Sequence, residues 1–455
     1  MTGPDWQDIF NATLPACGTG DAAIDTSRIV HGVTTYAVRS FDNDAVLFSV
    51  PVLVRRPLAE EIRADPAGAD GAVSCLIEHI KAQSARDEAL GPLSGRGTCY
   101  PGRYDATVEP YTVVRSLDAI GSHLWHADDR NFCDDDGVHF VVRGALPAAG
   151  HASPGRVLAD AIGGMLDAIG KAVHAFPAKE LERAWLNSLD QKLLRGGLEE
   201  RGLVSFIGDD SRLARHYTRH RCFFRIAGQK VGTSIPFACP AGLEPVELEL
   251  PATRGTITGL GIRRREVFAV AGSNAQGKTT FLEGITAGTD DHAAGDGRER
   301  VLTVRGLHTA EALTGQLAGA DVSMFFSALP PGIDGTVTAA YGTGSGSMTM
   351  AHQIGRAIRR RAPLLIIDED RAAPNLLVKS CLQKEEVTPL AAILANDRVR
   401  MGDTTLVFAA CAMDTLIAQA DRIMVLDRHV AGAVDRSGFV AMLRDSLQRT
   451  AKEME

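Results

Sequence analysis

The chain has 455 residues and a formal net charge of −8, with 45 % apolar and 23 % charged residues. This composition is typical of a globular protein of two or three domains and argues against a surface coated in basic side chains for nucleic acid. No apolar run is long enough to span a membrane, and the first ten residues do not resemble a signal peptide. The eight cysteines form no C-x-x-C pair, which favours reduced thiols. We therefore predict a cytoplasmic protein.

The first 150 residues predict a mixed α+β domain. Residues 29–55 are β-branched and alternate in polarity, which indicates two or three strands. Residues 57–90 are partly helical in pattern. The turn-forming residues 133–137 precede a further strand at 138–146.

Residues 151–240 predict a helical connecting region that packs on the core of the domain after it. One apolar stripe indicates a helix, because its members recur every four residues: Val157, Ala161, Met165, Ile169 and Val173. A second helix is expected over 179–202, and the apolar run that follows it predicts a buried strand.

Residues 241–440 predict an α/β domain, and 441–455 a helical tail. Strand patterns occur at 246–250, 256–260, 267–271, 363–370, 404–410 and 422–427. Helical patterns separate the later strands, at 351–360, 376–386 and 413–420. Strands that alternate with helices imply a mainly parallel sheet covered by helices.

The strongest motif matches G-x-x-x-x-G-K-[ST] at every fixed position and lies between a predicted strand and a predicted helix. Its backbone N–H groups and the start of the helix are expected to bind the phosphates of ATP. Lys278 is expected to reach the β- and γ-phosphates, and the Thr279 hydroxyl to bind Mg²⁺. The predicted nucleotide-binding residues are Gly272, Ser273, Asn274, Ala275, Gln276, Gly277, Lys278, Thr279 and Thr280.

A second motif, at residues 364–369, consists of four apolar residues followed by Asp368 and Glu369. This is the Walker B pattern. Asp368 is predicted to hold Mg²⁺ and Glu369 to polarise the attacking water, so Glu369 and Lys278 are the predicted catalytic residues. A strand ending in solvated carboxylates is the alternative, but the position 90 residues after Lys278 favours the catalytic interpretation.

The adjacent Asp-Glu pair is typical of ABC-class ATPases, which also need a signature loop that caps the γ-phosphate of a partner subunit. The Gly/Ser run at 342–350 is the candidate, with Ser345, Gly346 and Ser347 at the start of a predicted helix. Hydroxyls and N–H groups at a helix N-terminus suit an anion. A flexible linker is the alternative.

Together these motifs give a specific resemblance. Over roughly residues 140–430 the chain resembles the predicted ATPases of the ABC class, a group separate from the transporters. The stretches that carry the resemblance are 201–215, 235–262, 290–299, 345–351 and 364–375. It implies an ABC-type P-loop domain that hydrolyses Mg·ATP in a homodimer, and it weakly implies RNA binding.

The chain also departs from this family. The D-loop at 371–375 retains only Ala373 and Asn375 and lacks the family's hydroxyls, which puts coupling between subunits in doubt. No histidine follows the strand that ends at Ala410, although transporter-type domains have a switch histidine there. We identify no adenine-stacking aromatic residue just before the P-loop and no Q-loop glutamine.

A basic stretch at 212–225 contains five arginines, two histidines and Tyr217. It could bind the phosphates of RNA or single-stranded nucleic acid and stack on bases. The alternative is a solvated loop beside a strand whose phenylalanines lie in a core.

Three further functions remain open beside the ATPase interpretation. A P-loop kinase would transfer phosphate to an acceptor, and a nucleotide-gated binding scaffold would bind ATP with little turnover. A transporter subunit is the third, although the large N-terminal region argues against it.

Overall fold

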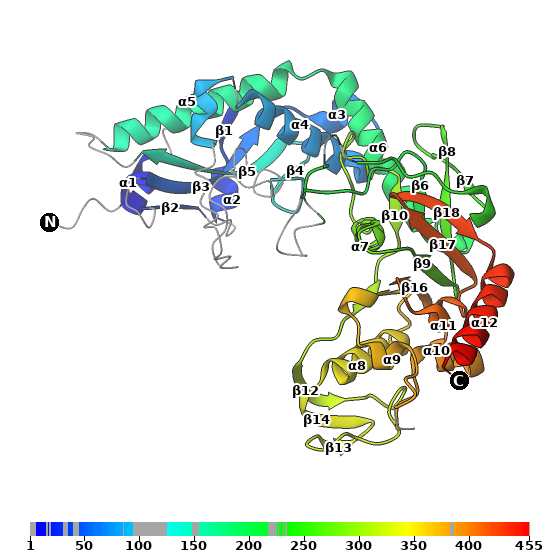
Figure 1. Ribbon diagram of the computed structural model, residues 1–455. Coiled ribbons are helices and arrows are strands. Elements are labelled where there is room, and N and C mark those ends of the chain that lie inside the picture. Colours follow the sequence, from blue (N-terminus) through cyan, green and yellow to red (C-terminus); the bar gives the residue numbers. More distant parts are fainter. Residues whose placement is uncertain are drawn as a thin grey trace. The chain divides into compact units, whose positions relative to one another are not determined.

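The computed structural model describes residues 6–454, with gaps at 15–16, 18–19, 31–34, 40–44, 85, 94–124, 148–153, 217–224, 226, 231, 233 and 383–385. The chain divides into two compact units (Figure 1). Unit 1 comprises Met1–Lys192, Arg215–Lys230 and Asp291–Asp296, and unit 2 comprises Leu193–Ala214, Val231–Asp290 and Gly297–Glu455. The predicted domain boundaries at 150, 240 and 440 stay a prediction. No helix in the described ranges combines the length and apolarity needed to cross a bilayer.

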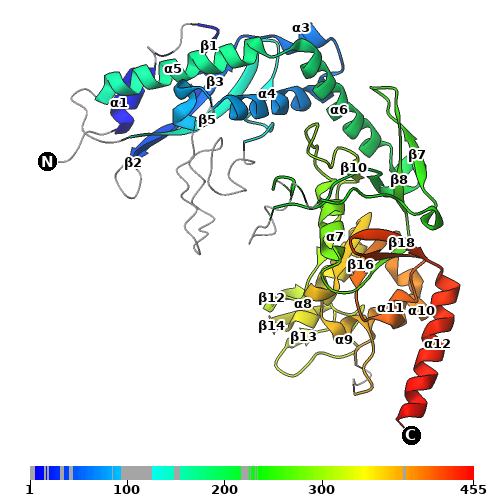
Figure 2. The same ribbon diagram turned by 45° about the horizontal axis from the view of Figure 1, so that its top comes forward.

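Unit 1 is built on one antiparallel sheet with the strand order β1-β3-β5-β4, and β2 pairs with β3. The helices α4 and α5 run along this sheet (Figure 2). The strands are β1 (Ala22–Ile24), β2 (Tyr36–Arg39), β3 (Ala45–Val54), β4 (Phe132–Cys133) and β5 (Val138–Pro147). The helices are α1 (Trp6–Thr13), α2 (Thr26–Val30), α3 (Leu58–Ile62), α4 (Ala69–Gln83), α5 (Pro154–Ala175) and α6 (Ala178–Gly196), with short 3₁₀ turns at Pro66–Gly68 and Glu88–Leu93.

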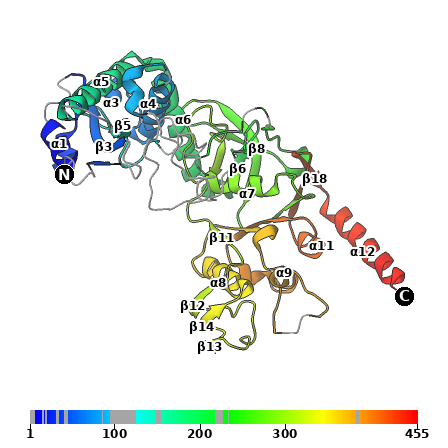
Figure 3. The ribbon, with the colours of Figure 1, turned by 60° about the vertical axis from the view of Figure 1, so that its left-hand side comes forward.

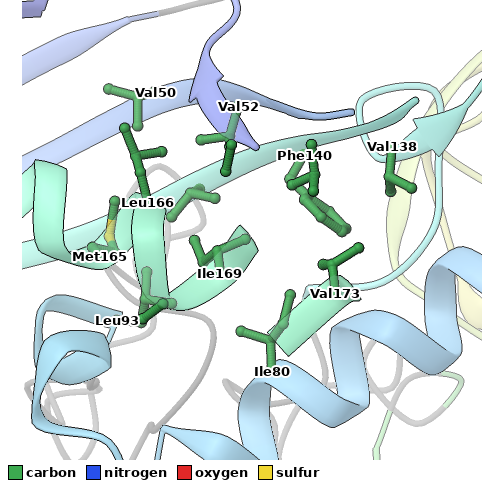
Figure 4. Close-up of a cluster of buried hydrophobic side chains, with 14 of the residues drawn as sticks. Val50, Val52, Ile80, Leu93, Val138, Phe140, Met165, Leu166, Ile169 and Val173 are labelled. Carbon is green, nitrogen blue, oxygen red and sulfur yellow. The ribbon is translucent and has the colours of Figure 1, made fainter. Parts of the chain in front are cut away.

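The core of unit 1 lies between the sheet and these helices. Strand β3 is buried almost throughout, and its alternate residues, among them Val50 and Val52, face this core because successive side chains of a strand point to opposite faces. Figure 4 shows them facing Met165 and Ile169 of α5. The predicted stripe of α5 is therefore buried from Met165 onward, whereas Val157 near its start is exposed.

Unit 2 contains three sheets (Figure 3). A four-stranded antiparallel sheet has the order β10-β6-β8-β7, a six-stranded sheet has the order β11-β15-β16-β9-β17-β18, and a small antiparallel sheet has the order β12-β14-β13. The strands are β6 (Leu203–Gly208), β7 (Val246–Glu249), β8 (Thr256–Arg263), β9 (Val267–Ala271), β10 (Val301–Thr303), β11 (His308–Ala310), β12 (Gly315–Ala320), β13 (Asp334–Thr336), β14 (Ala339–Gly344), β15 (Leu364–Asp368), β16 (Thr405–Ala410), β17 (Arg422–Asp427) and β18 (Val430–Val434).

The helices of unit 2 alternate with the strands of the six-stranded sheet. They are α7 (Lys278–Ala287), α8 (Gly346–Arg359), α9 (Pro374–Leu377), α10 (Leu390–Asn396), α11 (Asp414–Ile417) and α12 (Arg436–Glu453), with 3₁₀ turns at Glu199–Arg201, Ala241–Leu243, Glu369–Arg371 and Arg398–Met401. Strands β11, β15, β16, β9 and β17 are parallel, and only β18 is antiparallel. The predicted fold class, an α/β P-loop domain preceded by an α+β region, is confirmed.

Several local predictions are wrong. The helix expected over 376–386 is only the four-residue α9, since Val378 already has an extended backbone. The first two residues of the region predicted as strands, 29–55, belong to the helix α2 (Thr26–Val30) instead. The second long helix ends at Gly196 instead of 202, and the C-terminal helix begins at Arg436, capped by the Asp435 side chain, instead of 441. Short strands and turns are also predicted over 95–145, and residues 95–124 of this stretch lie outside the described residues.

Candidate nucleotide site

The P-loop connects β9 to α7 in a conformation that requires glycine at two positions. Gly272 has φ +134° and Gly277 has φ +98°, in the region that side chains other than glycine rarely adopt. At Gly272 a Cβ atom would also lie 2.4 Å from the carbonyl oxygen of Leu426 in β17. The local sequence thus forms a tight loop packed directly against a neighbouring strand.

Lys278 lies across this loop. Its Nζ donates to the carbonyl oxygens of Gly272 at 2.7 Å and Ser273 at 2.9 Å, and its side chain is buried. The ammonium group is thereby held within the loop that precedes the N-terminus of α7. Both the charge of the lysine and the positive end of the helix favour a bound anion there.

Thr279 meets Asp368 at the carboxyl end of the sheet. The Thr279 hydroxyl donates to Oδ2 of Asp368 at 2.8 Å. Asp368 is the last residue of β15, separated from β9 by β16, and it is buried. These two oxygens, 89 residues apart in the sequence, fit Mg²⁺, which prefers carboxylate and hydroxyl ligands beside phosphates.

Glu369 follows Asp368 in a 3₁₀ turn. Its Oε2 accepts a hydrogen bond from the backbone N–H of Cys411, the residue after β16. Cys411 occupies the position at which transporter-type domains have a switch histidine. The structure thus brings Glu369, a predicted catalytic residue, to the end of β16, beside Asp368.

An electrostatic cluster surrounds Arg371 and is not predicted by any motif in the sequence. Its Nη1 lies 3.0 Å from Glu283 of α7 and 3.4 Å from Glu311, which follows β11. Its Nε lies 3.8 Å from Asp368. In the sequence Arg371 stands out only as a departure from the family's D-loop. Its three carboxylate partners could not be identified because two of them are 60 or more residues away.

The Gly/Ser run is part of regular structure. Gly344 ends β14 and Gly346 begins α8, with Ser345 in an extended conformation between them. The Ser347 hydroxyl donates to Oδ1 of Asn375, the retained asparagine of the D-loop, at 2.8 Å. Among the interactions of the described residues, none joins this loop to the P-loop of the same chain.

The comparison with protein families agrees with this geometry. A model of the P-loop domain of the ABC ATPases matches residues 177–455. The chain belongs to the ABC-ATPase family. The match begins just before α6 and covers all of unit 2, including the P-loop, the Walker B strand and the Gly/Ser loop.

Two further similarities are found. An uncharacterized protein of Methanocaldococcus jannaschii is 40 % identical over 375 residues, which cover 82 % of each protein. A solved chain of a metal-chelate-type ABC transporter in an inward-facing conformation is 14 % identical, with a TM-score of 0.27 over 42 % of this chain and 82 % of that one.

The basic stretch of this ABC ATPase is only partly described, since residues 217–224 lie outside the described ranges. Arg212 donates to the carbonyl oxygen of Ser234. Arg215 is buried, and its guanidinium binds both the backbone and the carboxylate of Asp296 at 2.8–2.9 Å. These two arginines therefore bind the protein itself. Nucleic-acid binding by the stretch stays a prediction.

Asp421 anchors the start of the P-loop strand. Its Oδ2 accepts from the N–H of Val267 at 2.9 Å, and its Oδ1 accepts from Nη1 of Arg398 at 2.7 Å. Partial burial alone would raise the pKa of this carboxyl, but the hydrogen bonds from Arg398 and Val267 outweigh it and lower the pKa.

A carboxyl with a lowered folded-state pKa stabilises the fold above its unfolded pKa, and this contribution is lost as the pH falls through the folded value. Asp421→Asn should therefore lower the free energy of unfolding at neutral pH and flatten its decline below about pH 4. Urea unfolding over a pH series would measure this. Asp403→Asn, which removes the exposed partner of Arg265, is the control. An unchanged pH profile in Asp421→Asn would contradict the prediction.

Proposed function

We propose that this ABC ATPase binds and hydrolyses Mg·ATP at the P-loop of unit 2. The observation that supports it most is the 2.8 Å hydrogen bond between the Thr279 hydroxyl and the Asp368 carboxylate. This bond unites the P-loop and the Walker B strand at one point, next to the buried ammonium of Lys278.

Each residue then has a separate task. The N–H groups of 272–277 and the N-terminus of α7 bind the phosphate oxygens, and Lys278 exchanges its carbonyl partners for the β- and γ-phosphates. Mg²⁺ on Thr279 and Asp368 would neutralise charge on these phosphates. Glu369 orients the attacking water and accepts its proton, once it exchanges the N–H of Cys411 for the water.

We further propose that two copies enclose ATP between them. The loop Ser345–Ser347 shares no hydrogen bond with the P-loop of its own chain in the described part, and its N–H groups begin the 14-residue helix α8. In a dimer it would face the γ-phosphate on the partner. The bond from Ser347 to Asn375 would link this loop to the D-loop. Closing and opening of the pair would move unit 1 and whatever it binds.

Phosphate release by the purified full chain with Mg·ATP tests the proposal, beside Lys278→Ala. We expect turnover in the wild type and at least about a 100-fold loss in the variant, since the lysine stabilises the charge of the transferred phosphoryl group. Phosphate on an acceptor instead of in solution would favour a kinase. Binding of ATP without turnover would favour a nucleotide-gated scaffold.

A further inference from the structure

The tip of the β17–β18 hairpin lies directly on the P-loop. The backbone N–H of Arg428 donates to Oε1 of Gln276 at 2.5 Å, and Nδ1 of His429 donates to the carbonyl oxygen of Gln276 at 3.1 Å. Just before the tip, the carbonyl of Leu426 packs against Gly272. The hairpin therefore contacts both the first glycine of the P-loop and its central part.

The two residues at this tip adopt a backbone conformation that is energetically unfavourable for residues with a side chain. Arg428 has φ +47° and His429 has φ +66°, so two consecutive residues with side chains occupy the left-handed region. Two-residue hairpin turns of this kind usually contain Asn and Gly, which adopt it more easily. Both side chains are exposed, so their burial does not explain why they are there. Strained positions of this type concentrate at functional sites.

The topology of the sheet gives the tip a defined place in the nucleotide site. Strand β9, which leads into the P-loop, lies between β16 and β17, and the three strands are parallel. The carboxyl ends of parallel strands share one edge, where ligands of open α/β sheets bind. On the β16 side of the P-loop lie Asp368 and Glu369, the metal and γ-phosphate end of the proposed site. The ribose and base of the nucleotide are therefore expected on the β17 side of the P-loop.

We propose that the turn Asp427–Val430 forms the wall of the nucleotide site on the side of the base. The imidazole of His429 packs on the purine ring, and the guanidinium of Arg428 lies beside the ribose. Gln276 is the positioning residue, because it binds both turn residues and belongs to the P-loop itself. This inference rests on the proposed ATP-binding function. It supplies a base contact where no adenine-stacking aromatic residue is identified just before the P-loop.

The double variant Arg428→Gly/His429→Gly tests the inference. Glycine keeps the N–H that binds Gln276 and relieves the positive φ, so the turn is preserved while both side chains are lost. Calorimetry on the full chain should show about tenfold weaker binding of Mg·ATP, the loss expected for one missing base contact. Binding of magnesium tripolyphosphate, which has neither base nor ribose, should be unchanged. Arg254→Gly is the matched control, since Arg254 is an exposed residue with φ +60° in the turn between β7 and β8.

Two results would overturn the inference while leaving the proposed function intact. One is wild-type affinity for Mg·ATP in the double variant. The other is an equal loss of affinity for Mg·ATP and tripolyphosphate, which would mean that the turn only supports the P-loop. A wild-type chain that binds neither ligand would overturn the proposed function as well, so the two failures are distinguishable.

Discussion

Replacing Glu369 by glutamine is expected to slow ATP hydrolysis about 100-fold to 10,000-fold, the usual contribution of a general base. The amide keeps the shape of the side chain, and its oxygen can still accept the hydrogen bond from the N–H of Cys411. It cannot take a proton from water. The nucleotide site should therefore stay folded and bind Mg·ATP with wild-type affinity while phosphate release is lost.

Asp370→Asn is the matched control, because Asp370 is the exposed neighbouring acid and has no assigned role. This variant should hydrolyse ATP at the wild-type rate. If Glu369→Gln retained full turnover, another group would have to be the base and the assignment of Glu369 would be wrong.

The same variant should reveal the proposed dimer. With hydrolysis blocked, Mg·ATP should remain enclosed between two copies, and light scattering after size exclusion should show twice the monomer mass only when ATP is present. Adding Ser345→Arg should return the protein to a monomer, since a long cation would fill the space of the γ-phosphate. A Glu369→Gln protein that binds ATP and stays monomeric would contradict the sandwich arrangement.

Gly272→Ala is expected to abolish measurable nucleotide binding and to destabilise unit 2 by about 2–4 kcal/mol. The added methyl would meet the backbone oxygen of Leu426 at 2.4 Å, which is too close for any Cβ contact, and φ +134° is strained for alanine. The loop can avoid the oxygen only by moving away from β17. That movement would displace the N–H groups meant for the phosphates.

Gly332→Ala is the control that separates the steric clash with Leu426 from the strain of a positive φ. Gly332 has φ +86°, but a Cβ there would have no atom within 4 Å. This control should lose only about 1 kcal/mol and bind Mg·ATP normally. Chemical unfolding and calorimetry would measure both variants. Equal effects of the two substitutions would show that close packing against β17 does not determine the shape of the P-loop.

The predictions that succeeded rest on local information. Strands β9, β15, β16 and β17 are short apolar runs, and a fully buried parallel strand must be apolar on both faces. The P-loop can be recognised from the sequence because its backbone conformation requires glycine at fixed positions. The helix predicted over 376–386 failed because its apolar residues, such as Leu376 and Leu377, are buried by tertiary packing around the four-residue α9.

By itself, the sequence determined the α/β class, the P-loop and the order of the motifs, because each depends on residues close together in the chain. The tertiary structure alone decided which distant residues meet. It paired Arg371 with Glu283 and Glu311, buried Arg215 against Asp296, and placed the turn at Arg428 on Gln276, 152 positions away. Such contacts follow from strand order and loop paths, which depend on the packing of the whole unit. Neither residue of such a pair therefore shows in its local sequence that it has a distant partner.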